Sequence, residues 1–256
     1  MQINTIYNEN CLETMARMSD GFVGLTVTSP PYDGLRTYNG YSFDFEGVAK
    51  ELYRVTKNGG VVVWVVGDGV ENGSETLSSF KQAIFFKEQC GFNIHDTMIY
   101  QKRNFSHPEK TRYHSVFEYM FVLSKGRLGT FNPIKDRKNL TAGAVGNLGV
   151  NTFTEKDGSK SVRTKKVTAE FGMRHNIWLG NTRGQEDMCV KLSHPAMMPK
   201  WVARDHIASW SNPEDIVYDP FLGSGTTAQE ARALGRNYIG SEISEEYCKM
   251  VHERLK

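Results

Sequence analysis

The chain has 256 residues, of which 39% are hydrophobic and 23% charged, and its formal net charge is +2 at pH 7. This length can bury a full core in one large domain, or in one domain with an insertion. No stretch approaches the roughly 18 apolar residues of a membrane span, and the first residues lack a basic-then-apolar signal pattern. Four scattered cysteines, without a CxxC pair or a Cys/His cluster, argue against disulfides and a metal site and predict a reduced, cytoplasmic protein.

The charge is unevenly distributed along the chain. Residues 101–190 carry 16 Lys and Arg against 8 Asp and Glu, whereas the remainder carries 15 against 21. A basic middle is compatible with a surface that faces phosphates, although a solvated basic loop would have the same composition. The candidate contacts to a nucleic-acid backbone are Lys102, Arg103, Arg137, Lys138, Arg163, Lys165 and Lys166.

In the first half of the chain, apolar runs alternate with helical patterns. A short apolar strand over 25–28 leads into a Pro-Pro turn. Apolar residues at helical spacing predict a helix over 46–57, which Asn58-Gly59-Gly60 would end. The unbroken β-rich run at 61–66 is apolar on both faces and predicts a central, covered strand. A further helix is expected over 75–90, with strands over 97–102 and 118–124.

The composition changes at about residue 127. From there to about 190 the chain is rich in Asn, Gly, Thr, Lys and Arg, which predicts a loop-rich inserted module. Regular elements then return, with a helix at 199–210, a strand at 216–218, a helix at 226–235, a strand at 238–240 and a final helix. Strands that alternate with helices predict a mostly parallel sheet covered on both faces.

The tetrapeptide Ser29-Pro30-Pro31-Tyr32 closes the first apolar strand. Each proline fixes its own φ and removes a backbone N–H, and Pro31 also restricts Pro30 toward extended conformations. The Pro30 carbonyl is then held outward as an acceptor, beside the Ser29 hydroxyl and the ring of Tyr32. This set suits a flat heterocycle that bears an amine, whereas the plainer interpretation is a strand end punctuated by prolines.

A glycine-rich turn, Asp219 to Thr227 (DPFLGSGTT), follows an apolar strand and opens a helix. Its glycines let the backbone approach a ligand closely, and the helix N-terminus offers unpaired N–H groups. No Lys follows the last glycine, so the turn is not a phosphate loop, and its opening Asp favours a ligand with a positive end. Glu242, at the end of the next strand, can accept both hydroxyls of a ribose. A nucleoside with a cationic tail, such as S-adenosylmethionine, fits both demands, whereas the alternative is a helix-start turn beside a surface Glu.

Together, TSPPY and DPFLGSGTT resemble the motifs of amino-methylating DNA methyltransferases, in the order of their β subgroup. The segments ELYRVTKNGGVVVWVVGD (51–68), HSVFEYMFVLSKG (114–126) and HPA (194–196) resemble further motifs of this family. The resemblance covers nearly all of the chain outside 127–190. It implies a Rossmann-like, seven-stranded α/β fold, with a catalytic half at 1–126, an inserted target-recognition region at 127–190 and a cofactor-binding half at 191–256.

The resemblance also implies roles for individual residues. The site of the target amine would be Ser29, Pro30, Pro31 and Tyr32. Asn10, in a segment where the family often has Asp, and its neighbour Cys11 would lie at the adenine of the cofactor. The other residues implied to bind S-adenosylmethionine are His194, Pro195, Asp219, Phe221, Gly223, Ser224, Gly225, Thr226, Thr227 and Glu242.

The expected activity is methyl transfer from S-adenosylmethionine to the exocyclic N4 amine of a flipped-out cytosine in DNA. Ser at position 29 favours cytosine, because the family associates SPPY more often with cytosine N4 and DPPY with adenine N6. Adenine N6 stays the alternative, and a catalytically inactive DNA-binding partner subunit is the candidate from another class. RNA and protein amine methylators are a third possibility, but they tend to carry the two motifs in the opposite order.

The expected partner is DNA, with a cognate restriction endonuclease as a further candidate. The protein is expected to act as a monomer or homodimer in the cytoplasm of a prokaryote, or to be encoded by a phage. No metal is expected. No readable code links the insertion to a base sequence, because base contacts come from side chains that the fold places.

Overall fold

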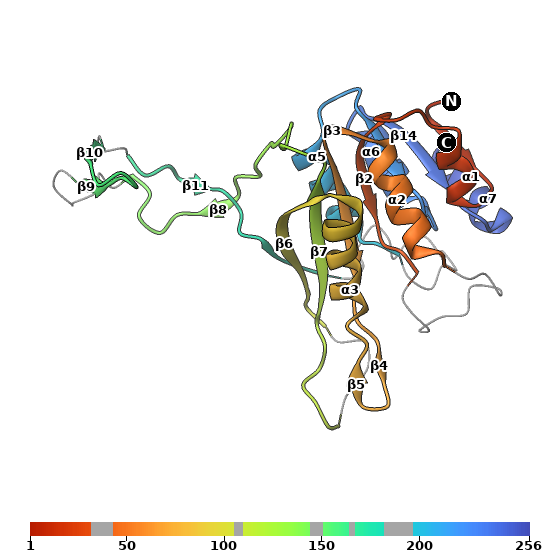
Figure 1. The fold of residues 1–256 in the computed structure, drawn as a ribbon, viewed down its shortest axis with the longest axis horizontal. Coiled ribbons are helices and arrows are strands. Elements are labelled where there is room, and N and C mark those ends of the chain that lie inside the picture. The colour runs from red at the N-terminus through yellow and green to blue at the C-terminus, as the bar shows by residue number, and fades with distance from the viewer. Residues whose placement is uncertain (32–42, 105–109, 144–150, 164–166, 182–196) are drawn as a thin grey trace. The chain divides into compact units, whose positions relative to one another are not determined.

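The computed structural model describes residues 1–31, 43–104, 110–143, 151–163, 167–181 and 197–256 (Figure 1). Tyr32, Lys165, Lys166, His194 and Pro195 lie outside these residues, and the roles predicted for them stay predictions. The described chain forms two compact units. One comprises Met1–Asn132 and Asn176–Lys256, and the other comprises Pro133–His175.

The first unit is built on a mixed sheet. Among the described residues its strands follow the order β1-β14-β13-β2-β3-β7-β6-β12. Neighbouring strands are parallel, except that β7 runs antiparallel to both of its neighbours. The strands are β1 (Thr5–Tyr7), β2 (Val23–Thr28), β3 (Thr56–Val66), β6 (Asn93–Lys102), β7 (Phe117–Ser124), β12 (Ile177–Gly180), β13 (Ile216–Asp219) and β14 (Asn237–Ser241). The predicted α/β architecture is confirmed, with one strand beyond the predicted seven, because β12 pairs with β6 at the edge.

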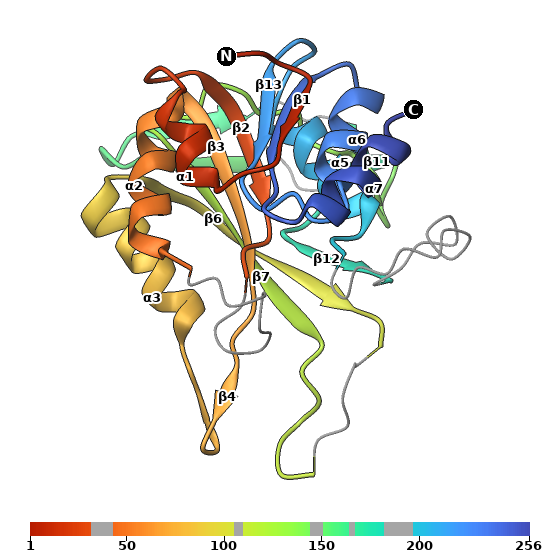
Figure 2. The same ribbon diagram turned by 90° about the vertical axis from the view of Figure 1, so that its right-hand side faces the viewer.

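Helices cover both faces of this sheet (Figure 2). Successive strand residues point to opposite faces, so β3 contributes to two cores. Its residues 62, 64 and 66 pack with α1 (Cys11–Ala16), α2 (Phe45–Val55) and α3 (Ser78–Phe85). Its residues 61, 63 and 65 pack with α5 (Lys200–Trp210) and α6 (Thr226–Ala233). The predicted burial of the 61–66 strand on both faces is therefore confirmed.

The helix predicted over 46–57 is α2, and it ends earlier than predicted, at Val55. Strand β3 begins at the next residue, so Asn58-Gly59-Gly60 lies inside a strand and does not form a helix-ending turn. The register between β2 and β3 shifts here, because Val23 lies opposite Thr56 whereas Leu25 lies opposite Val61. The glycines thus form a bulge, and the φ of +79° at Gly59 is one that glycine adopts without steric cost.

The helix predicted over 75–90 begins at Ser78 as α3 and continues as a π-helix, η1 (Phe86–Cys90). Asp68 holds its N-terminus, since its carboxylate accepts hydrogen bonds from the Ser79 backbone N–H (2.9 Å) and hydroxyl (2.6 Å). The strands predicted at 97–102, 118–124, 216–218 and 238–240 are β6, β7, β13 and β14. The three predicted helices of the last third are α5, α6 and α7 (Glu245–Arg254).

A short hairpin, β4 (Val70–Glu71) and β5 (Ser74–Glu75), extends beyond the carboxyl end of β3 (Figure 2). Residues 110–116, the described end of the connection from β6 to β7, extend in the same direction. Arg112 in that connection donates a hydrogen bond to the Gly73 carbonyl at the hairpin tip (2.9 Å), which joins the two projections. No helix in the described part of the chain has the length and apolar character that crossing a membrane requires.

The second unit, Pro133–His175, consists of two small antiparallel pairs. One joins β8 (Arg137–Lys138) to β11 (Phe171–Gly172), and the other joins β9 (Asn151–Thr154) to β10 (Lys160–Arg163). Arg174 forms an ion pair with Asp136 and so ties the start of this unit to its end. The unit lies inside the range 127–190 of the predicted insertion, whereas β12, in the same range, belongs to the main sheet.

Candidate functional site

Two adjacent strands bring the two main sequence motifs together. Strands β2 and β13 are parallel neighbours, with Tyr218 opposite Thr26. Chain connections leave these two strands in opposite directions along the sheet, toward β3 on one side and β14 on the other. Ligands of open α/β sheets bind outside the carboxyl ends of strands at such a point. The segments after Thr28 and after Asp219 begin there.

A hydrogen bond joins the two motifs directly. The Thr28 hydroxyl donates to Oδ1 of Asp219 across a distance of 2.6 Å, and both side chains are buried. The same carboxylate oxygen accepts the backbone N–H of Phe221 (3.0 Å). Burial raises the pKa of Asp219 to about 6, and the hydrogen bonds from Thr28 and Thr227 oppose that rise. The carboxylate thus lies at the opening of the glycine turn, where it can become an anion near neutral pH.

The glycine turn lies between β13 and α6. Gly223 and Gly225 have φ values of +53° and +81°, a region that glycine adopts readily. A Cβ at Gly225 would lie 2.8 Å from both γ carbons of Val251 in α7, so the turn also packs tightly against the last helix. The Leu222 backbone N–H donates to Ser241 (3.0 Å), which fixes the turn beside the end of β14.

Glu242 follows β14 and faces the same turn. Its Oε2 accepts the Gly223 N–H and its Oε1 accepts the Ser244 N–H, each at 2.8 Å. Burial raises the pKa of this carboxyl, and the hydrogen bonds from the backbone counteract the rise. Each carboxylate oxygen can accept further hydrogen bonds. The structure therefore brings together the predicted Asp219, the glycines and Glu242. Two carboxylates beside a glycine turn suit a cationic nucleoside.

Asn10 and Cys11 lie at the start of α1. The Asn10 side chain accepts the Leu12 backbone N–H (2.9 Å) and caps the helix, a structural role that the sequence did not indicate. Cys11 is buried, and burial raises its pKa to about 12. The negative charges of Asp219 and Asp44 also raise this pKa, which places the thiol near the turn. A nucleophilic thiolate is disfavoured at this position.

Ser29, Pro30 and Pro31 directly follow β2, and Pro30 is buried. The bond between Thr28 and Asp219 fixes the point at which this segment leaves the sheet, next to the glycine turn. The predicted amine site and the predicted cofactor site are therefore adjacent over their described residues.

Arg254 in α7 is a site residue that the sequence did not predict. Its Nη1 donates to the Ser224 carbonyl (2.8 Å) and its Nε donates to Gln229 (2.7 Å). The last helix thus supports the turn both through Arg254 and through Val251. No local pattern marks these residues, because the contact forms between segments about 30 positions apart.

The described residues predicted to contact DNA differ in their surroundings. Lys102 forms a largely buried ion pair with Glu118 (2.5 Å), so part of its charge is neutralised. Arg103, Arg137 and Lys138 are exposed, and Nε of Arg137 donates to the Met173 carbonyl (3.1 Å). Arg163 ends β10. Two further cations, the exposed Lys110 and the partly buried Arg112, lie in the connection between β6 and β7.

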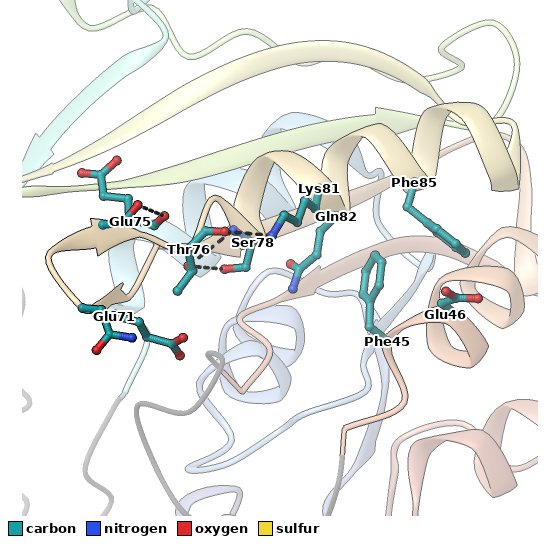
Figure 3. A pocket seen from close by; sticks show the side chains of 11 residues that line it. Phe45, Glu46, Glu71, Glu75, Thr76, Ser78, Lys81, Gln82 and Phe85 are labelled. Atoms are coloured by element: carbon teal, nitrogen blue, oxygen red, sulfur yellow. Dashed lines mark hydrogen bonds between the residues drawn. The ribbon is translucent and has the colours of Figure 1, made fainter.

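A cleft of about 750 Å³ lies between the β4–β5 hairpin, the start of α2 and α3 (Figure 3). Glu46, Glu71 and Glu75 line it with Lys81, whose ammonium donates to the Thr76 carbonyl (3.1 Å). Three carboxylates against one cation disfavour a phosphate here. No cluster of potential metal ligands is found among the described residues.

Solved structures share this fold. PvuII DNA methyltransferase (cytosine-N4-specific) matches with a TM-score of 0.72 and 18% identity, and the match covers 100% of this chain and 87% of that one. The complex of M1.HpyAVI with S-adenosylmethionine matches with a TM-score of 0.64 and 23% identity, over 98% of both chains. The chain thus has the fold of these methyltransferases.

Sequence comparison places the chain within this class. Residues 23–253 match the family model of the N6/N4 DNA methylases. The orphan methyltransferase M.BamHII of Bacillus amyloliquefaciens is 54% identical over 242 residues, which cover 93% of this chain and 91% of that protein. The chain belongs to the N6/N4 DNA methylase family and is an S-adenosylmethionine-dependent DNA methyltransferase.

Proposed function

We propose that this enzyme methylates the exocyclic N4 amine of cytosine in DNA. The observation that carries the proposal is the hydrogen bond between Thr28 and Asp219, because Ser29 and Pro30 directly follow Thr28 and the glycine turn directly follows Asp219. A base bound at the first segment and a cofactor bound at the second would lie within reach of each other. Correct placement of two reactants can supply about 7–11 kcal/mol of the barrier.

The Ser29 hydroxyl and the Pro30 carbonyl would accept the two N–H groups of the amine. This favours localisation of the nitrogen lone pair, which otherwise delocalises into the base ring. S-adenosylmethionine supplies an electrophilic methyl group on a sulfonium centre. The lone pair forms the new N–C bond, the electron pair of the C–S bond goes to sulfur, and one amine proton leaves to water. Asp219 and Glu242 would hold the cationic cofactor, and no covalent bond to the protein is needed.

The base must leave the helix to reach this site, which costs a few kcal/mol. Tyr32 would stack on the flipped base and return about 1–3 kcal/mol. Ser29 supports cytosine as the target, because SPPY accompanies cytosine N4 more often than adenine N6 in the family. Adenine N6 is the second candidate, since a neutral hydroxyl can accept a hydrogen bond from either amine.

Two basic surfaces would contact DNA phosphates. One is the connection between β6 and β7, with the exposed Arg103 and Lys110 and the partly buried Arg112. The other is the second unit, with the exposed Arg137 and Lys138. The region 127–190 would supply target recognition. Because the Bacillus amyloliquefaciens relative is an orphan methyltransferase, we propose that this enzyme also acts without a cognate endonuclease.

Mass spectrometry of nucleosides tests the proposal. DNA of varied sequence is incubated with the purified protein and S-adenosylmethionine and then digested. N4-methylcytosine is the expected product. Formation of N6-methyladenine would instead support adenine as the target. Absence of any methylated nucleoside would contradict both candidates. The Tyr32→Ala variant should form the product far more slowly, since it loses the stacking surface but keeps the cofactor site.

A further inference from the structure

Thr28 differs from the other buried hydroxyl on its strand. Thr26 and Thr28 both belong to β2, both are fully buried, and their spacing of two residues places them on the same face. The Thr26 hydroxyl has no hydrogen-bond partner within the described structure. The Thr28 hydroxyl instead donates to Asp219. Burying a hydroxyl costs free energy unless it forms a hydrogen bond. The Thr28 hydroxyl forms one, and the Thr26 hydroxyl does not.

The acceptor of the Thr28 hydrogen bond is the carboxylate of Asp219. Asp219 is only 4% exposed, and removing a carboxylate from water favours its neutral form. Hydrogen bonds donated to the anion counteract this effect, and the one from Thr28 has the largest opposing influence. The Phe221 N–H also donates to Asp219, and the Thr227 hydroxyl, which donates to the Val27 carbonyl (3.3 Å), lowers the pKa of Asp219 as well. Neither residue belongs to the TSPPY segment.

We propose that Thr28 is a positioning residue that holds Asp219 as an oriented anion for S-adenosylmethionine and so couples cofactor binding to the segment that receives the base. The inference rests on the proposed role of Asp219 as a cofactor ligand. Thr28 itself touches neither the cofactor nor the base. Its hydroxyl acts only through the carboxylate of Asp219.

Among the described residues, none of the titratable groups that face Asp219 is a cation. Glu242 faces it from the end of β14, Cys11 from α1 and Tyr218 from β13 itself. The negative charge of Glu242 raises the pKa of Asp219 further. The positive charge of the cofactor would favour the anion, so protonation of Asp219 should compete with cofactor binding.

The test measures the dissociation constant of S-adenosylmethionine by calorimetry, without DNA, between pH 5.5 and 8.5. In the wild type, binding should weaken as the pH falls through about 6. Thr28→Val keeps the shape but removes the donor, so the midpoint should rise by about one pH unit. One unit corresponds to about tenfold weaker binding in the acid range. Thr28→Ser should restore the wild-type profile.

Thr26→Val is the matched control, because it makes the same chemical change two residues away, and its pH profile should equal that of the wild type. In an Asp219→Asn background, Thr28→Val should have no effect on the pH profile. If Thr28→Val does not fold, Thr28→Ala provides the same deletion with less side-chain volume.

The outcomes separate two failures. A Thr28→Val profile that matches the wild type, or one that Thr26→Val reproduces, would overturn the role of Thr28 alone. A wild-type protein that binds no S-adenosylmethionine at any pH would overturn the cofactor site and this inference with it.

Discussion

At the scale of single residues, the burial of Asp219 opposes the charge that its proposed role requires. Its carboxyl is buried, with a pKa raised from 3.8 to about 6. A carboxyl that binds its proton more tightly in the folded state stabilises the fold below its unfolded pKa, and that stabilisation is lost as the pH rises through about 6. The difference corresponds to about 3 kcal/mol. The free enzyme therefore holds a destabilising anion where a cationic ligand would bind.

Asp219→Asn should separate these two effects. The amide keeps the shape and can still accept from Thr28, but it carries no charge. We expect the free variant to be more stable than the wild type at pH 8, with the difference shrinking by pH 5. Its affinity for S-adenosylmethionine should fall at least tenfold. Urea unfolding at the two pH values and calorimetry measure these quantities, and lower stability at pH 8 would contradict the account.

At the scale of elements, the last helix supports the glycine turn. Gly225 is the N-cap residue of α6 and has a positive φ, and Val251 of α7 fills the space where a side chain at Gly225 would lie. Gly235 provides a comparison, because its φ is +72° but a Cβ there would meet nothing within 4 Å. The two positions share backbone strain and differ in packing.

Gly225→Ala should therefore cost more than Gly235→Ala. Both variants lose about 1–2 kcal/mol from the left-handed backbone, and Gly225→Ala should lose a further ~1–3 kcal/mol from overpacking. Adding Val251→Ala should recover part of the second loss. Chemical unfolding measures these differences, and equal costs at the two glycines would show that α7 can move away.

Local patterns predicted most elements and both motifs of the site. Strand 61–66, the glycine turn and Glu242 follow from composition and spacing within a few residues. The bulge at Gly59, the edge strand β12 and the supports from Arg254 and Thr28 do not, because each depends on a partner far along the chain. The pairing of Lys102 with Glu118 arises in the same way, since β6 and β7 must first lie side by side.

At the scale of the whole molecule, basic residues are distributed over two units. Arg137 and Lys138 form β8 in the second unit, and both are exposed. Lys50 and Lys249 on the helices of the first unit are also exposed and form ion pairs with Glu46 and Glu245. Equal charge changes at the two pairs thus differ in location, and at Lys50 and Lys249 they also break an ion pair on one helix.

Reversing both charges of β8, as Arg137→Glu with Lys138→Glu, should weaken DNA binding. Each phosphate contact contributes about 0.9 to the slope of log affinity against log salt, so the slope should flatten by about two. Lys50→Glu with Lys249→Glu should leave the slope near the wild-type value. Measuring the DNA affinity at several salt concentrations gives these slopes. Equal slopes in the two double variants would exclude β8 from the interface.

The pairing of β1 with β14 has a consequence for the order of the two motifs. The first strand of the chain lies beside the last, with Thr5 opposite Ile239. A rearranged gene that begins before β13, and joins Lys256 to Met1 through a linker, would encode the same neighbours in space. The same sheet could therefore form whichever motif is translated first. The order of the two motifs along the chain is thus not a requirement of the fold.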